Sequence, residues 1–165
     1  MELLLVRHAT AFERNPRRWP DDGERPLSPE GLSRARKAAA GMKQLTPAPV
    51  RVLVSPLVRT RQTAAILTEV SGWPEATECA ELAPGVTPQA LLATLRRMPG
   101  ARIAAVGHEP GLSRLLAIVL AGTAAPRAFR LRKMGAALLT FDGAARTGGA
   151  RLEWLLPAKV LRAAR

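Results

Sequence analysis

The chain has 165 residues, of which 47% are hydrophobic and 23% are charged, so composition indicates one folded domain and excludes a disordered chain. Twenty-five lysines and arginines against 13 acidic residues give a formal net charge of +12. This balance favours anionic partners such as phosphate esters, phosphoproteins or nucleic acid, and it is equally consistent with a compositional bias of the source genome.

Cysteine usage and apolar segments bear on the cellular compartment. Cys79 is the single cysteine, so no intrachain disulfide can form, which fits a reducing compartment. The apolar run before Arg7 lacks the features of a signal peptide. No segment approaches the roughly 20 apolar residues that a membrane span needs. We therefore expect a cytoplasmic protein without a membrane segment.

The chain opens on a continuous apolar run, residues 2–6 (ELLLV), which predicts a buried strand. Residues 12–26 follow with three prolines, several charges and no periodicity. We predict a long loop there, of a kind that is often functional. Ser28 and Pro29 then place a capping hydroxyl before a proline, which predicts a helix over residues 29–45.

The middle of the chain repeats this pattern of an apolar run followed by a capped helix. Residues 51–54 (RVLV) and 102–106 (RIAAV) predict two more buried strands. A Ser, Thr or Glu before a proline marks each further helix start. The predicted helices cover residues 56–71, 88–97 and 110–121, beginning at Ser55-Pro56, Thr87-Pro88 and Glu109-Pro110.

The last third of the chain predicts two strands and a tail. Residues 136–141 and 151–156 predict an antiparallel hairpin with a turn at 148–149, and residues 157–165 predict a short basic helix or a frayed end. The order of elements predicts one α/β domain over residues 1–165, with a mostly parallel central sheet and helices on both faces.

Two histidines are present, and each follows an apolar strand: His8 after LLLV and Arg7, His108 after IAAV and Gly107. Ligands of open α/β sheets bind at the carboxyl ends of the strands, so both can share a crevice with Arg59, which follows the third strand. A neutral imidazole is a nucleophile that phosphoryl oxygens do not repel, and arginines bind those oxygens. Singly, each residue is also typical of a structural or surface position; together they predict phosphoryl transfer.

Three ordered motifs around these residues resemble the histidine phosphatase superfamily, also called the phosphoglycerate mutase-like fold. LVRHA (5–9) is similar to its Arg-His signature, SPLVRTRQTA (55–64) to its second motif, and VGHEPGLS (106–113) to the segment with the second histidine. The short length and RPLSPEG (25–31) are most similar to SixA-type phosphohistidine phosphatases. The final hairpin also fits this family.

The resemblance implies a role for each matching residue. His8 would be the nucleophile that becomes phosphorylated, and Arg7, Arg59 and His108 would bind the phosphoryl group. The resemblance also implies a metal-independent reaction without a cofactor. Two histidines and one cysteine make a common zinc site unexpected, whereas a magnesium site built from carboxylates stays open.

The general acid has two candidates. Glu81 lies where mutase-like relatives carry an acidic donor, and Glu109 follows the second histidine, where it could instead cap the helix at Pro110. We favour Glu81 as the acid and expect Glu109 to bind substrate, with Arg25 from the 12–26 loop. A phosphohistidine substrate needs little acid catalysis, because its imidazole leaves readily.

Three functions remain possible, and we favour a phosphohistidine phosphatase that acts on a phosphorylated protein in signal transduction. The alternatives are a phosphatase of small phosphate esters and a non-catalytic module that binds phosphate or a polyanion. Mutases of the superfamily are longer than this chain. The arginines are dispersed and aromatic content is 4%, so we do not expect nucleic acid as a partner; we expect a monomer.

Overall fold

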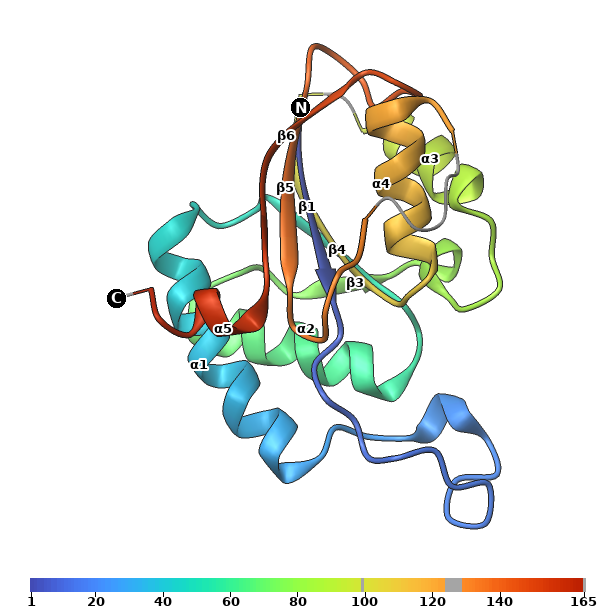
Figure 1. The fold of residues 1–165 in the computed structure, drawn as a ribbon, viewed down its shortest axis with the longest axis vertical. Helices are drawn as coiled ribbons and strands as arrows, with labels where there is room; N and C mark the ends of the chain where they lie inside the picture. The colour runs from blue at the N-terminus through green and yellow to red at the C-terminus, as the bar shows by residue number, and fades with distance from the viewer. Residues whose placement is uncertain (99, 124–128, 165) are drawn as a thin grey trace.

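A computed structural model describes residues 1–98, 100–123 and 129–164, and it shows one six-stranded sheet with helices on both faces (Figure 1). The strands are β1 (Glu2–Arg7), β2 (Arg51–Val54), β3 (Ala76–Glu78), β4 (Arg102–Gly107), β5 (Ala136–Phe141) and β6 (Ala150–Leu156). The α-helices are α1 (Pro29–Leu45), α2 (Val58–Ser71), α3 (Pro88–Arg96), α4 (Gly111–Ala121) and α5 (Ala158–Leu161). Two short 3₁₀ helices are η1 (Asp22–Glu24) and η2 (Ala80–Leu82).

The strands run in the order β3-β2-β4-β1-β5-β6. The first four are parallel to one another, and β5 and β6 are antiparallel to their neighbours. The predicted α/β fold with a mostly parallel sheet and a C-terminal antiparallel hairpin is therefore confirmed. The sequence pattern did not locate β3, a three-residue edge strand whose residues are mostly exposed.

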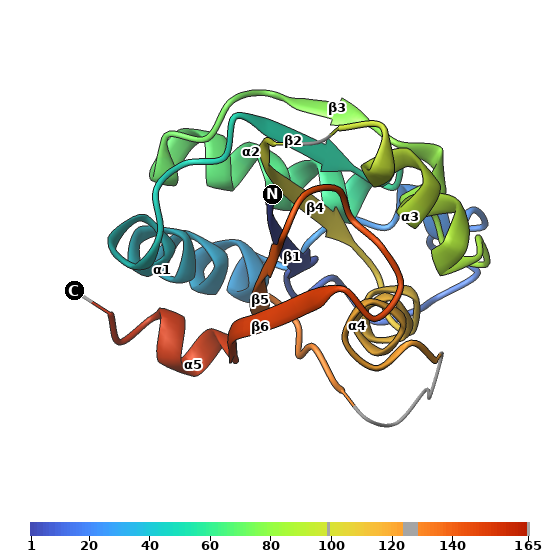
Figure 2. The same cartoon turned by 90° about the horizontal axis from the view of Figure 1, so that it is seen from above.

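The central strands alternate their side chains between two apolar layers, which explains their continuous apolar sequences. In β1, Leu3 and Leu5 pack in the layer that contains residues of α3 and α4. Leu4 and Val6 pack in the opposite layer, with residues of α1, α2 and α5. Figure 2 shows the sheet between these two groups of helices.

Two of the predicted helix starts differ in how their hydroxyl is used. Ser28 caps α1, because its Oγ accepts a hydrogen bond from the Gly31 amide at 3.1 Å. The expectation that Ser55 caps the next helix is wrong. Helix α2 begins at Val58, and the Ser55 hydroxyl is bonded to His108 instead.

The segment between β1 and α1 is the predicted long loop, and its ends are held together. Ala11 and Leu27 form an isolated antiparallel bridge at its base, and η1 lies near its end. The tail forms the short helix α5, which packs on α1. None of the helices described is long and apolar enough to cross a bilayer.

The contact between α1 and α5 yields a prediction. A Cβ at Gly41 would overlap the carbonyl oxygen of Leu161. We expect Gly41→Ala to lower the free energy of unfolding by about 1–3 kcal/mol through overpacking, although alanine is the better helix former by about 1 kcal/mol. Urea denaturation measures the change, with Ala40→Gly as the control at an exposed position of the same helix. A stabilised Gly41→Ala variant would contradict this packing.

Candidate active site

The parallel pairing of β1 with β4 places the two histidines next to each other. Arg7 pairs with Gly107 at the carboxyl end of the ladder, and the His8 amide donates to the Gly107 carbonyl at 3.0 Å. The two imidazole centroids lie 5.1 Å apart, with the rings tilted by 54°. Both side chains are almost fully buried, so the histidines form the floor of one site, as the strand ends predicted.

Among the residues described, the orientation of His8 leaves its Nε2 without a hydrogen-bond partner. Its Nδ1 lies 2.7 Å from the carbonyl oxygen of Ala9. A carbonyl can only accept a hydrogen bond, so Nδ1 carries the proton and Nε2 keeps its lone pair. The Ala9 amide in turn donates to Thr63 Oγ1 at 3.0 Å, and Thr63 donates to the Arg59 carbonyl at 2.7 Å. Helix α2 therefore fixes the backbone that orients the nucleophile candidate.

The His108 ring is held through its Nε2 atom. Its Nε2 lies 2.8 Å from the Ser55 hydroxyl, at the end of β2. The ring nitrogen left for a ligand is Nδ1. Ser55 is a site residue that the sequence pattern predicted to be a helix cap, because Ser-Pro before an amphipathic segment is also a helix-start signal.

Burial keeps both imidazoles neutral near pH 7. Burial lowers the pKa of His8 to about 4, and the charges of Arg59 and Arg7 act in the same direction. Burial also lowers the pKa of His108 to about 3, again with contributions from His8, Arg59 and Arg7. The neutral form has the lone pair that nucleophilic attack requires.

Arg7 and Arg59 each present an unsatisfied N–H group. Arg7 donates from one terminal nitrogen to the Leu131 carbonyl at 3.0 Å, and Arg59 donates to the Asp22 carbonyl at 2.7 Å. The Nε atoms of both arginines are buried and have no acceptor among the residues described. Burial lowers the pKa of both guanidinium groups. Phosphoryl oxygens are the acceptors that such donors fit.

Asp22 of η1 closes the site on the Arg59 side, and sequence analysis missed it. Its carboxylate lies 3.2 Å from Arg59 and 2.8 Å from Arg25, and the ion pair with Arg25 lowers the pKa of Asp22. Its negative charge also acts to raise the pKa of His108. No periodicity or motif marks Asp22, since it lies in an aperiodic loop with other acidic residues.

Arg25 lies beside the site but is already engaged. It donates to Asp22 and, at 2.6 Å, to the carbonyl oxygen of Phe12. Its positive charge lowers the pKa of Arg59, after the larger effect of burial. Its guanidinium therefore holds the loop, and the expectation that Arg25 binds substrate stays a prediction.

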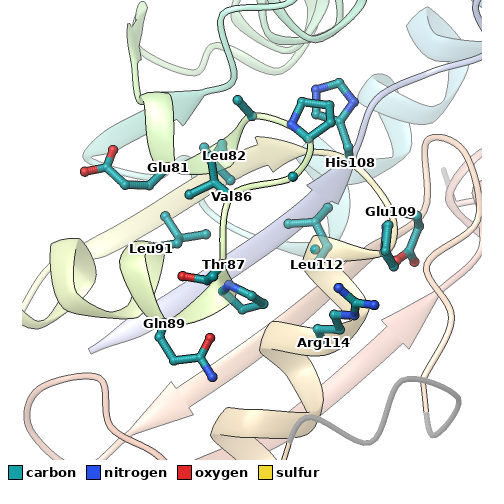
Figure 3. Close-up of a pocket in the computed structure, with 16 residues that line it drawn as sticks. Glu81, Leu82, Val86, Thr87, Gln89, Leu91, His108, Glu109, Leu112 and Arg114 are labelled. Atoms are coloured by element: carbon teal, nitrogen blue, oxygen red, sulfur yellow. The ribbon is translucent and has the colours of Figure 1, made fainter.

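A cavity of about 500 Å³ adjoins the site between residues 81–89 and the start of α4, with His108 and Glu109 on its wall (Figure 3). The Glu109 carboxylate accepts hydrogen bonds from Ser113 Oγ at 2.5 Å and from the Leu131 amide at 2.8 Å. The Ser113 amide also donates to this carboxylate at 3.3 Å. Glu109 therefore accepts hydrogen bonds from the first turn of α4, which agrees with the alternative expectation that it caps this helix.

Glu81 lies in η2, at the other end of the cavity in the view of Figure 3. Its carboxylate accepts from Thr94 at 3.1 Å and from the Cys79 thiol at 3.2 Å. Hydrogen bonds from its own backbone, Cys79 and Thr94 lower the pKa of Glu81, which opposes a role as proton donor. Across residues 1–98, 100–123 and 129–164, no group of three or more His, Cys, Asp or Glu side chains is arranged to hold a metal ion.

The depressed histidine pKa values predict a pH dependence. An unfolded histidine has a pKa of about 6.5, so between roughly pH 6.5 and 4 the unfolded chain binds more protons than the folded one. We therefore expect the free energy of unfolding to decrease as the pH is lowered through this window. The decrease should be about 1.4 kcal/mol per pH unit for each histidine. Urea denaturation of the parent and of His8→Asn measures this slope. NMR titration of the His8 and His108 ring protons above pH 5.5 would contradict the assignment.

Comparison with known proteins agrees with this geometry. Residues 3–83 match the Histidine phosphatase superfamily (branch 1). An uncharacterized protein of Picosynechococcus sp. is 38% identical over 115 residues, which cover 68% of each chain. The structure of the protein histidine phosphatase SixA complexed with tungstate is 25% identical, with a TM-score of 0.83 over 98% of this chain and 99% of that one.

A more distant likeness concerns the fold alone. A phosphoserine phosphatase structure from Entamoeba histolytica is 16% identical, with a TM-score of 0.64 over 96% of this chain and 98% of that one. The ordered motifs, the match over residues 3–83 and the similarity to SixA along nearly the whole chain point to one conclusion. The chain belongs to the histidine phosphatase superfamily.

Proposed function

We propose that this protein hydrolyses phosphohistidine on a phosphorylated protein, through a covalent phosphoryl intermediate on His8. One observation carries the proposal: a neutral His8 has its Nε2 free beside two arginines whose buried N–H groups have no acceptor among the described residues. This combination supplies a nucleophile and the electrostatic stabilisation that phosphoryl transfer requires.

The first step forms the bond between His8 Nε2 and phosphorus and breaks the bond between phosphorus and the leaving imidazole. Arg7 and Arg59 stabilise the negative charge on the transferred oxygens, and His108 donates from Nδ1 when that atom carries its proton. Positive charge develops on the His8 ring and is stabilised by the Ala9 carbonyl on Nδ1–H. Water then attacks the phosphorus, which releases inorganic phosphate and returns His8 to its neutral form.

The engaged carboxylates favour a phosphoramidate over an ester. An alkoxide leaving group needs a proton from a nearby acid, whereas an imidazole protonated on its other nitrogen leaves as a neutral molecule. Glu109 accepts three hydrogen bonds, and the pKa of Glu81 is lowered by its own contacts. Both carboxylates are therefore already engaged as hydrogen-bond acceptors in this arrangement. The similarity to a structure named as a protein histidine phosphatase supports the same substrate class.

The covalent step is tested by intact-protein mass spectrometry after mixing with phosphoramidate and quenching at alkaline pH, where phosphohistidine survives. We expect a gain of one phosphoryl group in the parent and none in His8→Ala. Arg59→Ala should accumulate the adduct at least about 100-fold more slowly, because it loses a transition-state contact. An unmodified parent under conditions that support turnover would exclude a phosphoryl-His8 intermediate.

The substrate class is tested by comparing kcat/KM for a phosphohistidine peptide with that for phosphoserine and sugar phosphates. We expect the peptide to be preferred by at least about 100-fold, which corresponds to about 2.7 kcal/mol of transition-state stabilisation. Equal or better turnover of the small esters would favour the alternative, a small-molecule phosphatase, and would require Glu81 or Glu109 to be released as the acid. The variants Glu81→Gln and Glu109→Gln identify which one.

A further inference from the structure

The cavity beside His108 has a composition that suits part of a substrate larger than a phosphoryl group. Leu82, Leu91 and Leu112 lie on its wall, and Val86 adds an apolar side chain that is 39% exposed at its rim. Pro84, Pro88 and Pro110 also line it and restrict its backbone, so the walls are largely fixed before a ligand arrives.

Three charged residues line this cavity, and they differ in what they already bind. The carboxylate of Glu109 is bonded to Ser113 and Leu131, and that of Glu81 to Cys79 and Thr94. Arg114 on α4 is exposed and forms no side-chain hydrogen bond or ion pair with any residue for which the structure gives a position. It is therefore the one charged lining residue whose side chain is uncommitted within the described part of the chain.

The position of Arg114 relates it to the chemistry. It lies on the first turn of the helix that follows His108, and both residues line the cavity. In Figure 3 its guanidinium lies on the Glu109 side of the cavity, away from Glu81. A leaving group attached to phosphorus at His8 would extend past His108, along apolar side chains, towards this positive charge.

We propose that this cavity binds the peptide around the phosphorylated histidine, and that Arg114 selects substrates with an acidic residue next to it. The inference rests on the proposed function, because it names the leaving group of that reaction. An apolar neighbour would contact Leu82 and Val86, and a carboxylate would pair with the guanidinium of Arg114. Arg114 acts on substrate affinity and takes no part in bond formation.

The experiment compares phosphohistidine peptides that differ by one negative charge, carried by a side chain of nearly the same size and shape. Two pairs place Asp or Asn directly before, or directly after, the phosphohistidine, and kcat/KM is measured for each. In the parent we expect the Asp peptide of at least one pair to be preferred by about fivefold, mainly through KM, as for a partly solvated ion pair. In Arg114→Gln the ratio of kcat/KM for the Asp peptide to that for the Asn peptide should fall to about 1. In Arg114→Glu the Asn peptide should be preferred.

A matched control separates local recognition from the overall charge. Arg34→Gln removes one positive charge from an exposed site on α1, on the other face of the sheet, and should keep the Asp preference. An Asp-to-Asn ratio of 1 in the parent, or a ratio that Arg114→Gln leaves intact, would overturn the inference while phosphohistidine turnover continued. Loss of turnover on every peptide in the parent would instead overturn the proposed function. Thermal unfolding of each variant checks that it is folded.

Discussion

The in-register parallel pairing of β1 with β4 is the constraint on which the site depends. Because the two strands end together at Arg7 and Gly107, the residues that follow them leave the sheet at the same point. The His8 amide completes the ladder by bonding to Gly107, so the backbone at the two histidines cannot separate without breaking the sheet. Since both strands lie in the middle of the sheet, with apolar layers on each face, the histidines are held by a fully buried part of the sheet.

Burial at this position has an energetic consequence that the chemistry uses. Removing two imidazoles from water disfavours their charged forms, and two neighbouring arginines disfavour them further. The protein therefore gives up stability in acid in return for a nucleophile that is fully neutral at physiological pH. A surface histidine with an ordinary pKa would be partly protonated there, and it would lack the fixed Nδ1 bond that directs Nε2.

The sequence could predict those parts of the site that depend on regular structure. His8 and His108 were located because an apolar strand has a definite end, and Arg59 because it follows another such end. Asp22 could not be found, since its contact with Arg59 depends on how the aperiodic loop folds back. Ser55 was misassigned, because a hydroxyl before proline is a helix-start signal whose meaning changes when a buried histidine lies within reach. The fold followed from the same strands, and the bounds of the edge strand β3 could not be predicted because it is short and mostly exposed.

The carboxylates around the site offset the positive charge of its two arginines. Arg59 is buried and Arg7 is partly buried, and without compensating charge the two would repel each other and destabilise the fold. Asp22 offsets Arg59 from the loop side, and Glu109 acts to raise the pKa of Arg7 from the helix side. Each carboxylate lies outside the central strands, Asp22 in η1 and Glu109 between β4 and α4, so each offsets the charge of an arginine from its own side of the site. The buried Nε groups, which have no acceptor among the residues described, remain for the phosphoryl oxygens, and this charge balance is compatible with binding an anion.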